Sequence, residues 1–329
     1  MKRMMMRWLT IVVSGLVLGA AWASAADKPV EIRYGLWAKE GEAQYTGALK
    51  FKEQLEQESA GAFKVIIYPG NQLGTPREML AQLALNTTQI CASGDPGIKE
   101  VEYLALPYLM KGIKNYNALI TSAIGEKWNQ QLVEKRKVRF LGFLPRSPRQ
   151  ISANKVINSM ADLKGLKLRA PERDYYVKSI AALGAKPTPM AFKEVYTSLQ
   201  TGIVDGQENP IETIYAQKFF EVQKCVVMID YIDKPAYVMI GEKFWQARTP
   251  AEREMILRAQ QASEAVVDEL LPGQQEEMIA KMKKAGIVFT YPDKAPFIAA
   301  TQPVRDELGI KTWGEALYRQ IVEIGKKEM

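Results

Sequence analysis

Residues 161–171 of this chain read Ala161-Asp162-Leu163-Lys164-Gly165-Leu166-Lys167-Leu168-Arg169-Ala170-Pro171. A second stretch follows from 194 to 210 and reads Glu194-Val195-Tyr196-Thr197-Ser198-Leu199-Gln200-Thr201-Gly202-Ile203-Val204-Asp205-Gly206-Gln207-Glu208-Asn209-Pro210. Together they predict strands at 166–170 and 204–207 and a helix at 193–201 that ends at Gly202. Asn209 and Pro210 have the residue types of a helix cap and first helical position, so another helix is expected after them.

The same alternation of strand and helix runs through the rest of the chain. Strands are expected at 30–37, 63–68, 89–92 and 139–144, and helices at 41–59, 76–85 and 173–183. This order predicts an α/β fold with mainly parallel sheets and helices on both faces. A capping box at Thr249 opens a long helical pattern to Lys284, which Pro272-Gly273 should kink or break. Its length suits a spine across two lobes.

Arg169 is the first candidate for binding, because it ends a predicted strand. Ligands of open α/β sheets lie beyond the carboxyl ends of the strands. A guanidinium at such a position can hold a carboxylate through two parallel, charge-assisted hydrogen bonds. The alternative from the residues alone is a structural ion pair with one of the many acidic side chains.

The first 25 residues have the pattern of a secretory signal. A basic start with Lys2, Arg3 and Arg7 precedes an apolar run at 8–22 and the small residues Ala23-Ser24-Ala25. We expect cleavage after Ala25 and export to the periplasm. The alternative, a membrane anchor, would need a longer apolar run.

Composition excludes several classes of function. The chain has no histidine, the commonest metal ligand and general base, and its two cysteines, Cys91 and Cys225, do not form a metal site. We expect both to be buried free thiols, and the alternative is that they pair in a disulfide, which an exported protein allows. Without the leader, 41 Lys and Arg face 37 Asp and Glu, a net charge of +4. The basic residues are scattered, which argues against nucleic acid.

The two quoted stretches resemble the signature of the solute-binding proteins of tripartite ATP-independent periplasmic (TRAP) transporters, the DctP family. Similarity extends over nearly the whole mature chain and is greatest, toward the sialic-acid-binding members, at 187–210 and 217–224. The resemblance implies a two-lobed periplasmic binding protein of class II with a long kinked helix spanning both lobes. Lobe 1 would comprise 26–146 and about 235–274, and lobe 2 would comprise 147–234 and about 275–329.

The resemblance also implies the binding residues. Arg169 would bind the ligand carboxylate in two-pronged fashion, Arg149 would be the second arginine, and Asn209 would complete the carboxylate clamp while still capping its helix. Phe192 would form an apolar wall. Glu194 and Tyr196 match the family motif and would support the pocket.

The first half of the chain departs from the sialic-acid binders, which places sialic acid itself in question. Trp37, Thr75-Pro76 and Ser93 stand where those members carry short polar or acidic residues. Trp37 narrows the cleft and offers an apolar face, and Ser93 lies where an acidic residue would reach the sugar. We therefore expect a smaller or more apolar acid: a C4-dicarboxylate, a keto or hydroxy acid, or a sugar acid. Asp95 is interpreted as a turn residue.

The expected function is capture of an organic acid by a monomer that delivers it to the small and large membrane subunits of a TRAP transporter. We expect no catalytic residues, no metal and no cofactor. One alternative is a sensor that signals to a membrane receptor. Another is a hydrolase with Asp205 and Glu208 as paired carboxylates, although the chain lacks a Gly-x-Ser-x-Gly motif.

Overall fold

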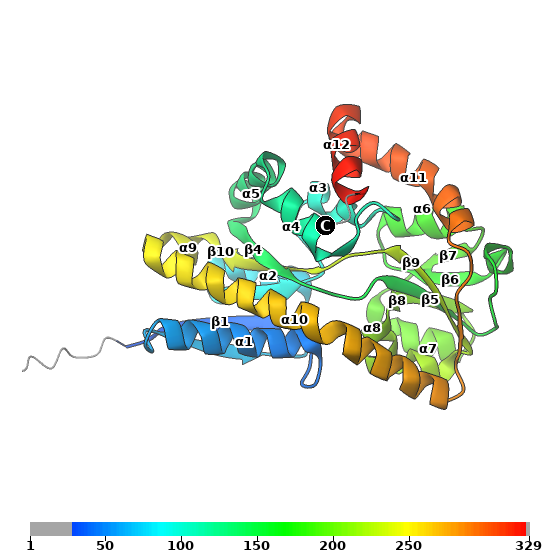
Figure 1. Ribbon diagram of the computed structural model, residues 1–329, viewed down its shortest axis with the longest axis horizontal. Coiled ribbons are helices and arrows are strands. Elements are labelled where there is room, and N and C mark those ends of the chain that lie inside the picture. Colours follow the sequence, from blue (N-terminus) through cyan, green and yellow to red (C-terminus); the bar gives the residue numbers. More distant parts are fainter. Residues whose placement is uncertain (1–27, 327–329) are drawn as a thin grey trace, which may run out of the picture.

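The computed structural model describes residues 28–326, and the predicted leader with its cleavage after Ala25 lies outside them. Strands collect into two separate sheets, each flanked by helices (Figure 1). No helix within 28–326 is long and apolar enough to cross a membrane. The two-sheet α/β architecture agrees with the predicted fold class.

The first sheet has five strands in the order β2-β1-β3-β10-β4. The strands are β1 (Val30–Leu36), β2 (Phe63–Tyr68), β3 (Ile90–Ser93), β4 (Val138–Leu144) and β10 (Ala236–Gly241). β1 pairs in parallel with β2 and β3, whereas β10 is antiparallel to β3 and β4. The sheet is therefore parallel on one side and mixed on the other, because the last strand to join it returns from the second sheet.

The second sheet has six strands in the order β11-β9-β5-β8-β6-β7. They are β5 (Arg149–Ala153), β6 (Lys167–Ala170), β7 (Lys186–Pro189), β8 (Gly206–Pro210), β9 (Cys225–Ile232) and β11 (Val288–Thr290). β6 is parallel to β7 and β8, and β5 is antiparallel to β8 and β9. The start of β5 therefore lies beside the end of β8, with Arg149 opposite Pro210.

Helices surround both sheets. The helices are α1 (Ala43–Glu58), α2 (Pro76–Leu85), α3 (Lys99–Glu102), α4 (Gly112–Ile120), α5 (Ala123–Arg136), α6 (Asp174–Ala182), α7 (Val195–Gln200), α8 (Ile211–Ala216), α9 (Glu242–Gln246), α10 (Pro250–Lys284), α11 (Ala295–Trp313) and α12 (Glu315–Lys326). Short 3-10 turns are η1 (Tyr103–Ala105), η2 (Met160–Leu163), η3 (Phe192–Glu194) and η4 (Phe219–Val222). The predicted helix 76–85 has the bounds expected from its sequence, with a capping box between Thr75 and Glu78.

Helix α10 runs past both sheets as one element (Figure 1). It begins behind the predicted capping box of Thr249 and Glu252 and ends at Lys284, and Pro272 lies inside it without breaking it. Val267 belongs to the core of the first sheet and Met282 to the core around α7 and α8. The helix continues because packing of its two halves against these cores stabilises it by more than the loss of the one backbone hydrogen bond that Pro272 cannot donate.

Two short segments also connect the sheets. Residues 145–148 lead from β4 to β5, and residues 233–235 lead from β9 back to β10. The C-terminal helices add a further connection, because Trp313 Nε1 donates to the Glu100 carbonyl at 3.1 Å and Asn115 Nδ2 donates to the Gly325 carbonyl at 2.9 Å.

The two cysteines are buried free thiols, as expected. Cys91 lies in β3 of the first sheet and Cys225 in β9 of the second. Burial raises the pKa of the Cys91 thiol to about 12, so this thiol stays protonated and unreactive.

Asp233, in the segment from β9 to β10, should make stability depend on pH. Burial raises its carboxyl pKa from 3.8 to about 6, although the Gly112 N–H donates to Oδ2 at 2.6 Å. Between these two values the folded protein holds a proton that the unfolded chain has lost, so stability falls as pH rises through this window. Asp233→Asn should therefore stabilise the protein by about 1–2 kcal/mol at pH 7.5 and by nothing at pH 4. Urea unfolding at both pH values measures this, and an equal effect at both would contradict it.

Candidate functional site

A cavity of about 770 Å³ lies between the two sheets and is lined by elements of both. All six residues predicted to bind ligand line it: Trp37, Ser93, Arg149, Arg169, Phe192 and Asn209. Trp37 and Ser93 come from the carboxyl ends of β1 and β3, whereas the other four come from the second sheet and the segment after it. The topology explains the convergence, since parallel strands present their carboxyl ends at one edge, and the antiparallel β5 begins at that edge with Arg149.

Arg169 is a buried cation without a counterion. Its residue is 3% exposed, and within 28–326 it makes no ion pair. Nε and Nη2 both donate to the Met190 carbonyl, at 3.2 and 2.9 Å. Burial lowers the pKa of this guanidinium, and the nearby charge of Glu208 only partly offsets that effect. The Nη1 side of the fork has no hydrogen bond to the described residues, so it can take an anion.

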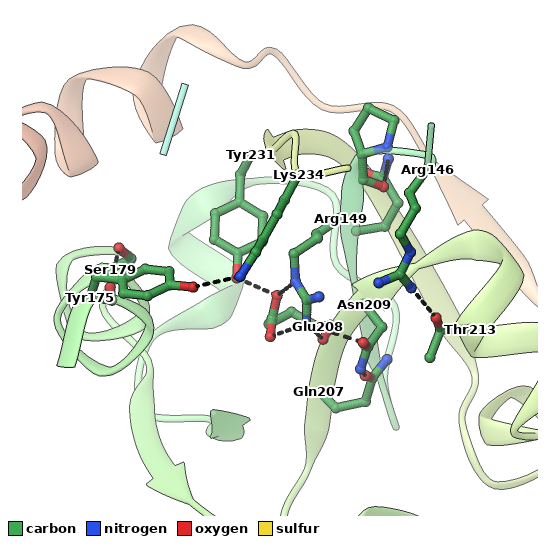
Figure 2. Close-up of polar contacts among 12 residues, drawn as sticks. Arg146, Arg149, Tyr175, Ser179, Gln207, Glu208, Asn209, Thr213, Tyr231 and Lys234 are labelled. Carbon is green, nitrogen blue, oxygen red and sulfur yellow. Dashed lines mark hydrogen bonds and ion pairs between the residues drawn. The ribbon is translucent and has the colours of Figure 1, made fainter. Parts of the chain in front are cut away.

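Arg149, in contrast, has its charge balanced. Its Nε and Nη2 donate to the two carboxylate oxygens of Glu208, and Nη2 also donates to the Glu208 carbonyl at 2.8 Å (Figure 2). Tyr231 Oη donates to the same carboxylate at 2.6 Å. Burial by itself would lower the pKa of Arg149, but the Glu208 charge outweighs burial and raises it well above its ordinary value. Arg149 thus remains charged and held in place, and its Nη1 has no hydrogen bond to the described residues.

Asn209 lies in β8, and the expectation that it caps the next helix is wrong. Pro210 is the residue before α8, and no side-chain hydrogen bond caps that helix. The Asn209 Oδ1 accepts from Arg149 Nη2 at 3.1 Å, and Nδ2 donates to Gln207 Oε1 at 2.5 Å (Figure 2). The ladder with β5 holds Asn209 in extended backbone. The second Nδ2 hydrogen has no acceptor among the described residues. Asn209 lies at the same edge of the second sheet as both arginines.

Aromatic side chains line the cavity beside these polar groups. Phe192 is 45% exposed, and the centroid of its ring lies 5.9 Å from the Arg169 guanidinium carbon. Trp37, from the first sheet, lies under Arg146, with the guanidinium carbon 5.2 Å from the ring centroid. Arg146 Nη2 also donates to Thr213 Oγ1 at 2.8 Å. Trp37 is thereby connected through Arg146 to helix α8 of the second sheet.

Ser93 and Asp95 form the turn after β3. The Ser93 hydroxyl accepts from the Asp95 N–H at 3.0 Å, and Asp95 Oδ1 accepts from the Gly97 N–H at 2.9 Å. The interpretation of Asp95 as a turn residue is correct. Its Oδ2 additionally contacts Arg173 Nη2 at 3.4 Å, across the cavity from the first sheet to the second.

Sequence reasoning missed several residues of the cavity. Arg146, Arg173, Tyr175 and Lys234 all line it, and Lys234 Nζ donates to Tyr175 Oη at 3.3 Å (Figure 2). Only Arg146 could have been found, because it lies next to the Arg149-Gln150 pair on a Pro-bounded segment. The rest come from segments whose approach to the cavity depends on tertiary packing.

The paired carboxylates of the hydrolase alternative have separate partners. Asp205 accepts from the Lys167 N–H at 2.8 Å and from Asn154 Nδ2 at 3.2 Å, while Glu208 is bound by Arg149 and Tyr231. Among residues 28–326 there is also no group of three or more His, Cys, Asp or Glu side chains that could hold a metal ion.

Comparison with known proteins identifies a family and relatives that match this chain over most of its length. The family model described as bacterial extracellular solute-binding protein, family 7 (DctP) matches residues 34–312. The chain is 35% identical to the sialic acid-binding periplasmic protein SiaP of Vibrio cholerae over 90% of this chain and 93% of that protein. It is 30% identical to the C4-dicarboxylate-binding periplasmic protein DctP of Rhodobacter capsulatus, covering 94% and 97%.

Solved structures of TRAP periplasmic solute-binding proteins are similar to this chain over 90% of its length. The TRAP periplasmic solute-binding protein of Roseobacter denitrificans with bound L-galactonate has a TM-score of 0.77 at 30% identity, covering 90% of this chain and 99% of that one. A protein of the same type from Haemophilus influenzae with bound L-gulonate has a TM-score of 0.79 at 25% identity, covering 90% and 99%.

Fold and cavity therefore define a two-lobed periplasmic binding protein. The chain belongs to the DctP family, bacterial extracellular solute-binding protein family 7. Its function is that of a TRAP transporter's solute-binding protein, which binds small organic acids and delivers them to a membrane permease.

Removing the counterion of Arg149 should destabilise the fold. Glu208→Gln leaves a buried guanidinium without its carboxylate, which costs about 3–5 kcal/mol of unfolding free energy. Glu221→Gln, which removes the partner of the exposed Lys218 at 3.5 Å, should cost less than about 1 kcal/mol. Chemical denaturation compares them, and similar losses in the two variants would contradict the role of the buried pair.

Proposed function

We propose that the carboxylate of the ligand binds between Arg169, Arg149 and Asn209. The observation that carries this is the buried charge of Arg169, which has no carboxylate partner within 28–326. Burying an unpaired charge is unfavourable, so an anion that supplies the partner binds with a large advantage. The free donors are Nη1 of each arginine, the remaining Nη2 hydrogen of Arg169 and one amide hydrogen of Asn209.

Phe192 and Trp37 supply the apolar walls of the same site, with Ser93 at the carboxyl end of β3.

The protein acts as a monomer, without catalysis and without cofactor, in the periplasm after removal of residues 1–25. Closure brings together lobe 1 (26–146 and about 235–274) and lobe 2 (147–234 and about 275–329) through differential affinity for the ligand. The loaded form then docks on the small and large TRAP membrane subunits.

Relatives support an acid as ligand, since the names of two of them specify sialic acid and C4-dicarboxylates, and two structures contain L-galactonate and L-gulonate. A sensor that signals to a membrane receptor would use the same binding site. Genes for two membrane subunits beside this one would favour transport.

Arg169→Lys should weaken binding of the acid by about 100-fold, because a single ammonium cannot reproduce the two parallel bonds of the fork. Isothermal titration of the mature protein with the acid that gives the largest thermal shift measures this. Arg258→Lys, an exposed position paired with Glu58 on the outside of α10, is the matched control. Unchanged affinity in Arg169→Lys, with the fold intact, would remove Arg169 from the site.

Trp37→Asn should widen the cavity and extend the range of ligands to larger sugar acids such as sialic acid. The indole is the ring on which Arg146 stacks, so its removal opens the wall between the first sheet and α8. A thermal-shift screen against acids of increasing size tests it, with Tyr291→Asn, an exposed residue outside the cavity, as control. An unaltered ligand range would show that Trp37 does not limit ligand size.

A further inference from the structure

The charges of the side chains that line the cavity favour a ligand with one negative charge. Three of its cations are paired: Arg149 with Glu208, Arg146 with Glu212 at 3.4 Å, and Arg173 with Glu102 at 2.9 Å. Lys39, Arg77 and Lys193 also line it, but they are exposed residues whose charges water screens. Arg169 is thus the buried cation of this lining that lacks a carboxylate.

Lys234 does not add a second free charge. Its half-buried ammonium donates to Tyr175 Oη and has no carboxylate within 4 Å among the described residues. It nevertheless lies in the field of Glu102, whose carboxyl pKa is raised by burial and lowered in part by Lys234 and Arg173. Lys234 and Arg173 together balance Glu102 and Asp95, so this group is close to neutral.

The wall that the first sheet contributes carries three acidic side chains beside the exposed Lys39 and Arg77. Glu42 lies immediately before α1, Asp95 follows β3 and Glu102 ends α3, and all three line the cavity. Glu42 Oε1 accepts from the Lys39 N–H at 3.0 Å, and Glu102 Oε1 accepts from Arg173. The second oxygen of Glu42 and of Glu102 has no hydrogen-bond donor among residues 28–326. Burial raises the pKa of both carboxyls, although neither second oxygen is fully buried.

These oxygens can accept hydrogen bonds from a ligand, and the chemistry of the ligand's far end follows from that. A hydroxyl group can donate to a carboxylate, whereas a second carboxylate brings no proton and repels the three acids already there. The cavity volume of about 770 Å³ falls in the range that holds drug-sized molecules, which leaves space for an acid of about six carbons or more.

We propose that the preferred ligand is a polyhydroxylated acid with a single carboxylate, and that Glu42, Asp95 and Glu102 select it against dicarboxylates. This proposal rests on the carboxylate clamp of Arg169 given above. It separates sugar acids from C4-dicarboxylates among the classes that the sequence leaves open.

Matched pairs of acids that differ only at the far carbon test the proposal. Galactonate against galactarate, and gluconate and glucuronate against glucarate, exchange a hydroxymethyl or aldehyde carbon for a second carboxylate, while succinate and hexanoate lack the hydroxyls. At pH 7.5, titration calorimetry of the mature protein should show the best monocarboxylate bound at least about tenfold more tightly than its dicarboxylate partner, succinate or hexanoate. Equal or tighter binding of an aldarate, succinate or hexanoate would overturn the proposal and leave the clamp standing. Binding of no acid at all would instead overturn the proposed function.

Two variants locate the selectivity. Glu102→Gln and Glu42→Gln should each reduce the preference for the monocarboxylate over its dicarboxylate partner by about threefold or more, because a neutral amide no longer repels the second carboxylate. Glu100→Gln, on the same helix as Glu102 but outside the cavity lining, should leave that ratio unchanged. An unchanged ratio in both cavity variants, with thermal unfolding showing that they are folded, would overturn the role of these residues.

Discussion

Two arginines are buried at one end of the second sheet, and only one of them has a carboxylate. The Arg149–Glu208 pair is internal to adjacent strands, so it holds β5 against β8 whether or not a ligand is present. Because Glu208 is bound to Arg149, Arg169 has no carboxylate partner among residues 28–326. The proposed binding site thus combines the charge-balanced Arg149–Glu208 pair with the unpaired cation of Arg169.

The rest of the fold places acidic and aromatic groups opposite that cation. Residues 145–148 and 233–235 join the two sheets, and α10 is packed against the cores at both of its ends. Arg146 and Lys234, which line the cavity, lie on these two connecting segments. Changes in the angle between the sheets would therefore move side chains of the cavity directly, which is the arrangement needed for ligand-linked closure.

The sequence predicted the strands that carry the site and the six residues that converge on the cavity. Their convergence has a physical basis, since the carboxyl ends of the parallel strands and the start of the antiparallel β5 meet at one edge, and since a family motif indicates which residues to expect there. Asn209 and Pro272 show where local rules fail. The ladder with β5 keeps Asn209 extended, and packing on two cores carries α10 through Pro272.

Glu208 shows a different limit of sequence reasoning. Its neighbour Asp205 suggested a carboxylate pair, yet Glu208 binds an arginine that lies 59 residues away in the chain. Pairing between distant residues depends on strand register, which composition and spacing do not specify. The same holds for the acidic side chains of Glu42, Asp95 and Glu102, which come from three separate segments.

A crystal structure of the complex with the most tightly bound acid would show where the ligand carboxylate lies. We expect the ligand carboxylate on the Nη1–Nη2 edge of Arg169, within hydrogen-bond distance of Arg149 Nη1 and Asn209 Nδ2, while Nε still donates to the Met190 carbonyl. A carboxylate directed toward Trp37 and Glu42, with Arg169 left without an anion, would contradict this expectation.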